Sequence, residues 1–132
     1  MADKLMRTTV VMLFFVGMAL FSSCGTNGKV LTKADNDRQI SVNPGDGITL
    51  TLESNPTTGY SWQVMEIDNS VLAQIGEPEY KSDGRNIPGA GGTEIFRFEA
   101  IGIGKTTLVL AYMRPWESVP PIEIFTIQVV VQ

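Results

Sequence analysis

The sequence predicts an all-β protein folded as an antiparallel β-sandwich. From about residue 38 onward, apolar residues recur at every second position, which is the period of a half-buried strand. Turns rich in glycine and proline separate these runs at short intervals. The chain has 132 residues, enough for one domain with its own core. Several short strands with turns at regular spacing favour two packed sheets.

The individual strands follow from this alternation. In the first clear run, Ile48, Leu50 and Leu52 lie on one face and threonines lie on the other. One helical turn or two are expected around residues 69–75. The alternating runs span residues 48–54, 61–67, 93–99, 105–113 and 125–131. The turn signals occupy residues 43–47, 102–104 and 120–121.

The N-terminal segment has the layout of an export signal. Lys4 and Arg7 precede an uncharged apolar run at residues 10–21, which is too short for a comfortable membrane span. Two serines then stand directly before Cys24, an arrangement that resembles the lipobox of bacterial lipoproteins. We therefore expect Cys24 to be lipidated. The alternative is an ordinary signal cleaved nearby, with Cys24 incidental.

This expectation divides the chain into three parts. Residues 1–23 are predicted to be a lipoprotein signal peptide, residues 24–37 a polar tether, and residues 38–132 the folded domain. Lipidation of Cys24 would anchor the exported protein to the bacterial cell envelope, facing the periplasm or the cell surface. A stable anchor needs more than one acyl chain.

Composition excludes several classes of function. The chain has no histidine and one cysteine, so it cannot supply a Ser-His or Cys-His nucleophile or a zinc site of the usual Cys and His type. We expect no metal, no cofactor and no enzymatic activity. A formal net charge of −4 argues against nucleic acid as a partner. With a single cysteine, packing rather than a disulfide must hold the sheets together.

The connection after the first clear strand is stiffer than a turn requires. Pro56 fixes its own φ and restricts the residue before it, while Gly59 permits a positive φ. Thr57 and Thr58 are β-branched and have few side-chain conformers. This first loop is therefore predicted to hold one shape and to present two hydroxyls. It consists of Asn55, Pro56, Thr57, Thr58, Gly59 and Tyr60.

Two further loops are unusual. The glycine loop, within residues 84–93, contains Gly89, Ala90, Gly91 and Gly92, which leave bare backbone for close approach of another chain. The arginine–tryptophan loop contains Arg114, Pro115 and Trp116, and Arg and Trp are enriched at interface hot spots. Each loop alone is more simply a turn. By our strand count they follow the second, fourth and sixth strands, so all three should meet at one end of the sandwich.

The ordered motifs resemble those of the chagasin family of cysteine peptidase inhibitors. N-P-T-T-G-Y at 55–60, G-A-G-G at 89–92 and R-P-W at 114–116 occur in the family's order, each between predicted strands. The resemblance covers about residues 38–132. It implies an immunoglobulin-like sandwich, expected to be a monomer when free, that reversibly inhibits papain-like (cathepsin L-like) cysteine peptidases.

The resemblance also implies a role for each loop. The first loop would enter the active-site cleft beside the enzyme's catalytic cysteine and histidine, with Thr57 and Thr58 offering hydrogen bonds. The glycine loop would lie along the non-primed side of the cleft. The arginine–tryptophan loop would pack on the primed side. A cleft-filling edge without a correctly aligned scissile bond would escape hydrolysis.

Two other classes of function are open to the sequence. A cell-surface adhesion or carbohydrate-binding module could stack Tyr60, Tyr112 and Trp116 on a sugar, although the sequence offers no flat aromatic strip. A carboxylate-based hydrolase could use a pair of glutamates. Their spacing is more typical of solvated strand edges. The candidate pairs are Glu77 with Glu79 and Glu94 with Glu99.

Overall fold

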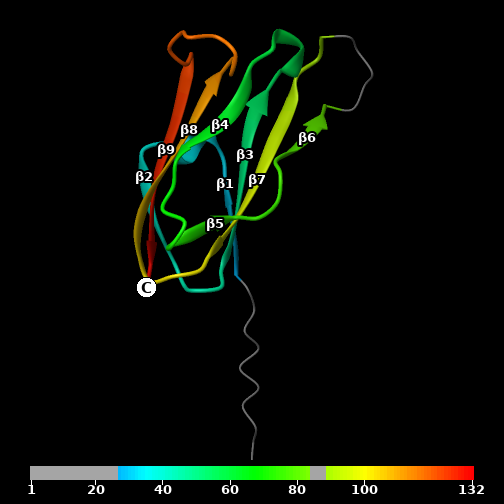
Figure 1. Ribbon diagram of the computed structural model, residues 1–132. Coiled ribbons are helices and arrows are strands. Elements are labelled where there is room, and N and C mark those ends of the chain that lie inside the picture. Colours follow the sequence, from blue (N-terminus) through cyan, green and yellow to red (C-terminus); the bar gives the residue numbers. More distant parts are fainter. Residues whose placement is uncertain (1–26, 84–88) are drawn as a thin grey trace, which may run out of the picture.

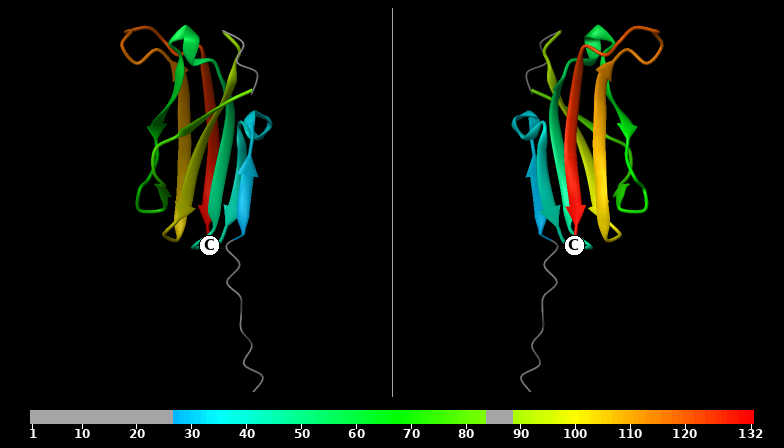
Figure 2. Two further views of the ribbon diagram at one scale, coloured as in Figure 1. Left: turned by 90° about the vertical axis from the view of Figure 1, so that its right-hand side faces the viewer. Right: turned by 90° about the vertical axis from the view of Figure 1, so that its left-hand side faces the viewer.

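A computed structural model describes residues 27–83 and 89–132 and confirms the all-β class. Two sheets pack face to face, and the described chain contains only two 3-10 turns besides strands (Figure 1, Figure 2). The predicted signal peptide at 1–23 and the proposed lipidation site Cys24 lie outside the described residues.

Each sheet draws its strands from both halves of the domain. The first sheet has the order β1-β3-β7-β5, and β6 also pairs with β7. The second has the order β2-β9-β8-β4. The first sheet contains β1 (Gly28–Leu31), β3 (Gly47–Ser54), β5 (Leu72–Gln74), β6 (Glu79–Ser82) and β7 (Gly92–Ala100). The second contains β2 (Arg38–Val42), β4 (Ser61–Glu66), β8 (Gly104–Met113) and β9 (Glu123–Val131). The 3-10 turns are η1 (Lys33–Asp35) and η2 (Pro56–Thr58).

The pairing is antiparallel except at two sheet edges. β1 runs parallel to β3, and β2 runs parallel to β9. The predicted antiparallel sandwich is confirmed, with these two parallel pairs as additions that the sequence did not indicate. Alternation along a strand reports which face is buried, but it carries no information about the direction of the neighbouring strand.

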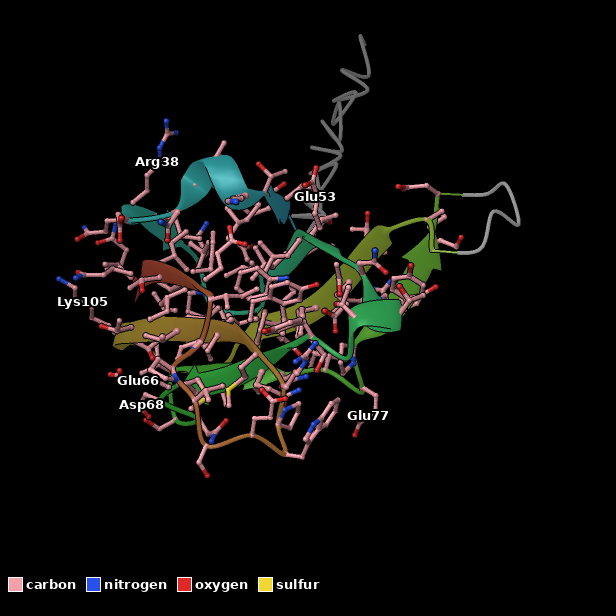
Figure 3. All side chains as sticks on the ribbon, turned by 90° about the horizontal axis from the view of Figure 1, so that it is seen from above. Arg38, Glu53, Glu66, Asp68, Glu77 and Lys105 are labelled. Atoms are coloured by element: carbon pink, nitrogen blue, oxygen red, sulfur yellow. The ribbon has the colours of Figure 1, made fainter. Side chains whose placement is uncertain are left out.

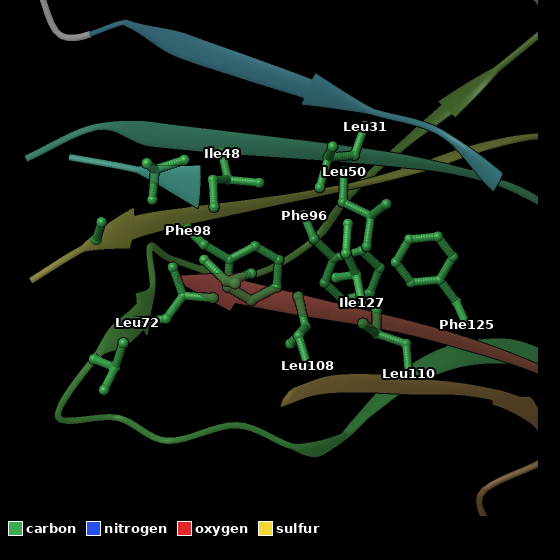
Figure 4. Close-up of a cluster of buried hydrophobic side chains, with 14 of the residues drawn as sticks. Leu31, Ile48, Leu50, Leu72, Phe96, Phe98, Leu108, Leu110, Phe125 and Ile127 are labelled. Atoms are coloured by element: carbon green, nitrogen blue, oxygen red, sulfur yellow. The ribbon is translucent and has the colours of Figure 1, made fainter. Parts of the chain in front are cut away.

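The core lies between the sheets and follows the predicted alternation. Ile48, Leu50 and Leu52 of β3 are fully buried, as are Phe96 and Phe98 of β7 opposite them in register. The side chains from both sheets interdigitate in one cluster (Figure 4). Its members in the second sheet are Val42, Trp62, Leu108, Leu110, Phe125, Ile127, Val129 and Val131.

Residues 69–75 do not form the predicted helix. They form a turn followed by β5, because the Asp68 carbonyl accepts the amides of Val71 and Leu72 at 3.0 Å and the chain then pairs with β7. Leu72 is completely buried there. A single amphipathic turn and a three-residue strand share the same short apolar pattern, and burial against the sheet decides between them.

The predicted tether at 24–37 is wrong from residue 28 onward, because β1 and η1 belong to the folded domain. Leu31 of β1 is buried in the core. Lys33 of η1 forms an ion pair with Glu123 of β9, and this hydrogen-bonded partner raises the pKa of Lys33. The strand could not be recognised from the sequence, because the segment is polar overall and contributes only one side chain to the core.

Candidate functional site

The three unusual loops lie together at one end of the sandwich, as the strand count predicted. They connect β3 to β4, β6 to β7 and β8 to β9, and Figure 1 shows them above the sheets. Two hydrogen bonds join them: Asn55 Nδ2 donates to the Gly89 carbonyl at 3.2 Å, and Arg114 Nε donates to the Thr58 carbonyl at 3.0 Å. The first loop is therefore bonded directly to both neighbours.

The first loop is a single capped 3-10 turn. The side-chain oxygen of Asn55 accepts from the Thr57 amide at 3.3 Å and from the Thr57 hydroxyl at 2.6 Å. The Thr58 hydroxyl donates to the Asn55 carbonyl at 2.6 Å. Gly59 then ends the turn with a φ of 81°. Pro56 at the first position of the turn suits a φ near −65°.

The threonine hydroxyls are not simply presented to a partner as the sequence predicted. Thr57 and Thr58 both use their hydroxyl hydrogens within the loop. Towards another molecule these oxygens can therefore act as acceptors, while their donor capacity stabilises the turn. The stiffness predicted from residue types is thus reinforced by side-chain hydrogen bonds that the sequence does not reveal.

An aromatic stack supports the first loop from below. The Tyr112 hydroxyl accepts the Asn55 amide at 2.9 Å. The Tyr112 ring lies 5.5 Å from that of Tyr60 and 5.1 Å from that of Trp62, measured between centroids. Trp62 is fixed in turn, because its indole nitrogen donates to the Glu53 carbonyl at 2.9 Å. The first loop is therefore supported by aromatic side chains that pack against the core.

The arginine–tryptophan loop lies against Gly59. A Cβ added to Gly59 would stand 2.7 Å from Cη2 and 2.9 Å from Cζ2 of Trp116, so only glycine allows this approach. Trp116 is nevertheless 70% exposed. Arg114 places its guanidinium 4.5 Å above the Tyr60 ring. The exposed indole is thus a large apolar surface beside the first loop.

The glycine loop is only partly the bare backbone that was predicted. Gly89 is exposed and has a φ of 82°, which a side chain would strain. Gly92, by contrast, is buried at the start of β7, and a Cβ there would overlap the Lys81 carbonyl and stand 2.6 Å from the Tyr80 hydroxyl. Gly92 therefore serves the packing of β6 on β7. Residues 84–88 lie outside the described part.

The carboxylate pairs proposed for a hydrolase do not form a site. Glu94 is buried and accepts the Trp62 amide at 3.0 Å, so it is not the solvated edge residue that its spacing suggested. Glu79 pairs with Arg97 at 3.1 Å. Glu77 points outward at the rim in the view from above (Figure 3). Within residues 27–83 and 89–132, no group of three metal-ligating side chains lies together.

A sugar-binding arrangement gains no support either. Tyr112 stacks on Trp62 and packs at a tilt against Tyr60, and Arg114 lies over the Tyr60 ring, so their faces are not offered as a platform. Of the three aromatic residues considered for this function, Trp116 is the one that is broadly exposed. In the described residues we also find no helix that is long and apolar enough to cross a membrane.

Comparison with known proteins places these loops in a family. The model of the chagasin family of peptidase inhibitors (family I42) matches residues 41–129. Chagasin of Trypanosoma cruzi is 36% identical over 90 residues, covering 65% of this chain and 81% of chagasin. Amoebiasin-1 of Entamoeba histolytica is 34% identical over 104 residues, covering 77% of this chain and 98% of amoebiasin-1.

The fold is also similar to a solved structure. The crystal structure of the cysteine protease inhibitor EhICP2 from Entamoeba histolytica matches with a TM-score of 0.73, covering 80% of this chain and 96% of EhICP2 at 24% identity. The sandwich, the three loops and the matching family model lead to one conclusion. The chain belongs to the chagasin family of peptidase inhibitors, so it is an inhibitor rather than an enzyme.

Proposed function

We propose that this protein inhibits papain-like (cathepsin L-like) cysteine peptidases reversibly, by placing its three loops across the active-site cleft. One observation carries the proposal most strongly. The three loops form a single surface in which the first loop is hydrogen-bonded to Gly89 on one side and to Arg114 on the other. This surface exists before any enzyme is bound.

Rigidity explains how such a surface could bind tightly. Ordering a mobile loop on binding reduces affinity, whereas a loop already held in the bound shape avoids most of that loss. The turn from Asn55 to Gly59 is closed by its own side chains and by Tyr112. A backbone tied into a closed turn also cannot extend along a cleft as a substrate does, so its peptide bonds are poorly placed for attack.

The two flanking loops would supply different contacts. Gly89 exposes a backbone on which a neighbouring chain can lie closely, while the Trp116 indole offers a wide apolar face. Exposed tryptophans at the centre of an interface often dominate binding energy. The first loop between them would thus be flanked by one backbone contact and one hydrophobic contact.

We further propose that Cys24 is lipidated and holds the inhibitor at the bacterial cell envelope. The support is the sequence pattern around Cys24 and the position of β1. β1 begins at the end of the sandwich opposite the three loops (Figure 1). A lipid on Cys24 would therefore leave the loops directed away from the membrane.

The inhibitor proposal is tested by titration of papain and a cathepsin L-like peptidase with the chain lacking residues 1–24. We expect reversible inhibition, with the inhibitor intact by mass spectrometry after long incubation. Trp116→Ala should weaken inhibition at least about tenfold, as expected for an interface hot spot. Ile103→Ala, at a residue equally exposed (70%) in the turn between β7 and β8, is the matched control and should not change it. Absence of inhibition at micromolar concentration would falsify the proposal.

A further inference from the structure

Arg114 is bound within the inhibitor by three different groups. Its Nε donates to the Thr58 carbonyl at 3.0 Å, and its Nη1 donates to Glu117 Oε1 at 3.1 Å. Its Cζ lies 4.5 Å from the centroid of the Tyr60 ring. Two of these partners belong to the first loop, so the guanidinium fastens the arginine–tryptophan loop to it.

The bond to Thr58 lies directly beside Gly59. Thr58 is the last residue of the 3-10 turn, and the next residue, Gly59, is the one on which the Trp116 ring rests. A Cβ on Gly59 would also lie 3.6 Å from Arg114 Nε. The guanidinium and the indole therefore contact the same short stretch of backbone.

Glu117 is the part of this arrangement that lies outside the three motifs. Its amide donates to the Arg114 carbonyl at 3.1 Å, closing a turn that brings its carboxylate to the guanidinium. Both side chains are partly buried. Exposed ion pairs contribute little to stability in general. Here the pair instead limits the orientation of a long side chain that has two further partners.

We propose that Glu117 is a positioning residue: through Arg114, it holds the first loop in the shape that enters the enzyme. Without the carboxylate, the flexible arginine side chain can turn towards water and leave the Thr58 carbonyl. The loop would then have to be reordered at each binding event. This inference rests on the proposed inhibition of cysteine peptidases.

Inhibition of papain by single and double variants provides the first test. Glu117→Gln should weaken inhibition about five- to tenfold with little change in melting temperature, because it removes orientation rather than core packing. Glu117→Asp keeps the charge, so its inhibition of papain should be intermediate between that of Glu117→Gln and that of the parent. Adding Glu117→Gln to Arg114→Met should cause no further loss, because Glu117 acts through Arg114.

The chain contains a matched control for this pair. Arg97 and Glu79 form a second ion pair at the same 3.1 Å, more exposed than the first, on the first sheet and outside the three loops. Glu79→Gln should leave inhibition unchanged. Fully additive losses for Arg114→Met and Glu117→Gln would overturn the proposal, since Glu117 would then act independently of Arg114.

A measurement on the free inhibitor separates this inference from the proposed function. In the parent, the Arg114 Nε hydrogen should exchange slowly with water in NMR spectra, because it is bound to the Thr58 carbonyl. Glu117→Gln should accelerate this exchange, whereas Glu79→Gln should not. If the parent inhibits no cysteine peptidase, the proposed function fails and the exchange rate still decides the positioning role. Unchanged exchange, or faster exchange with unchanged inhibition, would overturn that role.

Discussion

At the scale of single residues, Gly59 combines two requirements that only glycine meets. Its φ is 81°, in the left-handed region, and its missing side chain makes room for the Trp116 ring. The sequence predicted the first requirement, because glycine at the end of a proline-containing loop is typical of a positive φ. It could not predict the second, since Trp116 lies 57 residues further along the chain.

The two requirements can be separated by substitution. Gly59→Ala should lower the free energy of unfolding by about 1–2 kcal/mol through backbone strain, and it should also displace Trp116 and weaken inhibition. Gly45 has a φ of 91° with no atom near its missing Cβ, at the opposite end of the sandwich. Gly45→Ala should therefore cause a similar loss of stability without weakening inhibition. Urea denaturation and papain inhibition measure the two effects, and equal inhibition by both variants would contradict the role of the Trp116 contact.

Other residues of the site show where local patterns stop being informative. The motifs predicted which loops meet, but not that the Thr57 and Thr58 hydroxyls close the first loop. They also did not point to Tyr112, whose hydroxyl accepts the Asn55 amide. From the sequence, Tyr112 was considered only as an aromatic that could stack on a sugar, not as a support for the first loop. Hydrogen bonds of this kind depend on the register between strands that are distant in the sequence, and neither segment alone determines that register.

At the scale of elements, long strands were predictable and short ones were not. β3, β7, β8 and β9, each eight or more residues long, were identified because seven or more residues of alternation leave little ambiguity. β5 has three residues and β1 has four, with a single buried residue in each, so period alone could not reveal them. Whether such short segments form strands depends on pairing with a neighbouring strand.

β1 provides the test at this scale, because it was predicted to be a tether. Leu31 is 2% exposed and Val30, the residue before it in the same strand, is 70% exposed. Leu31→Ala should lower the free energy of unfolding by about 2–5 kcal/mol, through lost burial and the cavity left in the core. Val30→Ala should change it by less than about 0.5 kcal/mol, as for an ordinary surface position. Similar denaturation midpoints for the two variants would show that β1 is not part of the cooperative unit.

At the scale of the whole molecule, topology placed the loops correctly without knowledge of their contacts. Successive connections in a sandwich alternate between its two ends, so loops after the second, fourth and sixth strands of the predicted domain had to meet. The structure has two strands more than that count: β1 precedes the predicted domain, and β5 and β6 both pair with β7 where one strand was counted, so the three loops still lie at one end. The first residue of β1, Gly28, pairs with Gly47 at the end of the sandwich away from the loops.

The same topology makes the proposed lipid anchor testable. Only Gly25, Thr26 and Asn27 separate Cys24 from the start of β1, so a lipid on Cys24 would hold this end close to the bilayer. β3 runs eight residues from that end to the first loop, which places the loops about 25 Å further from the membrane. An anchored inhibitor should therefore remain accessible to a peptidase in solution.

The test uses the whole chain, produced in a bacterium that processes lipoproteins and then reconstituted into vesicles. This vesicle-bound protein should inhibit papain with the same inhibition constant as the soluble domain, when only the outward-facing molecules are counted. The Cys24→Ser variant should fail to associate with the vesicles, since a lipid and not the domain provides the attachment. Unimpaired vesicle association of Cys24→Ser would refute lipidation at this residue. Vesicle-bound protein that leaves papain active, while the soluble domain inhibits it, would show that the loops face the bilayer and would contradict the orientation derived from β1.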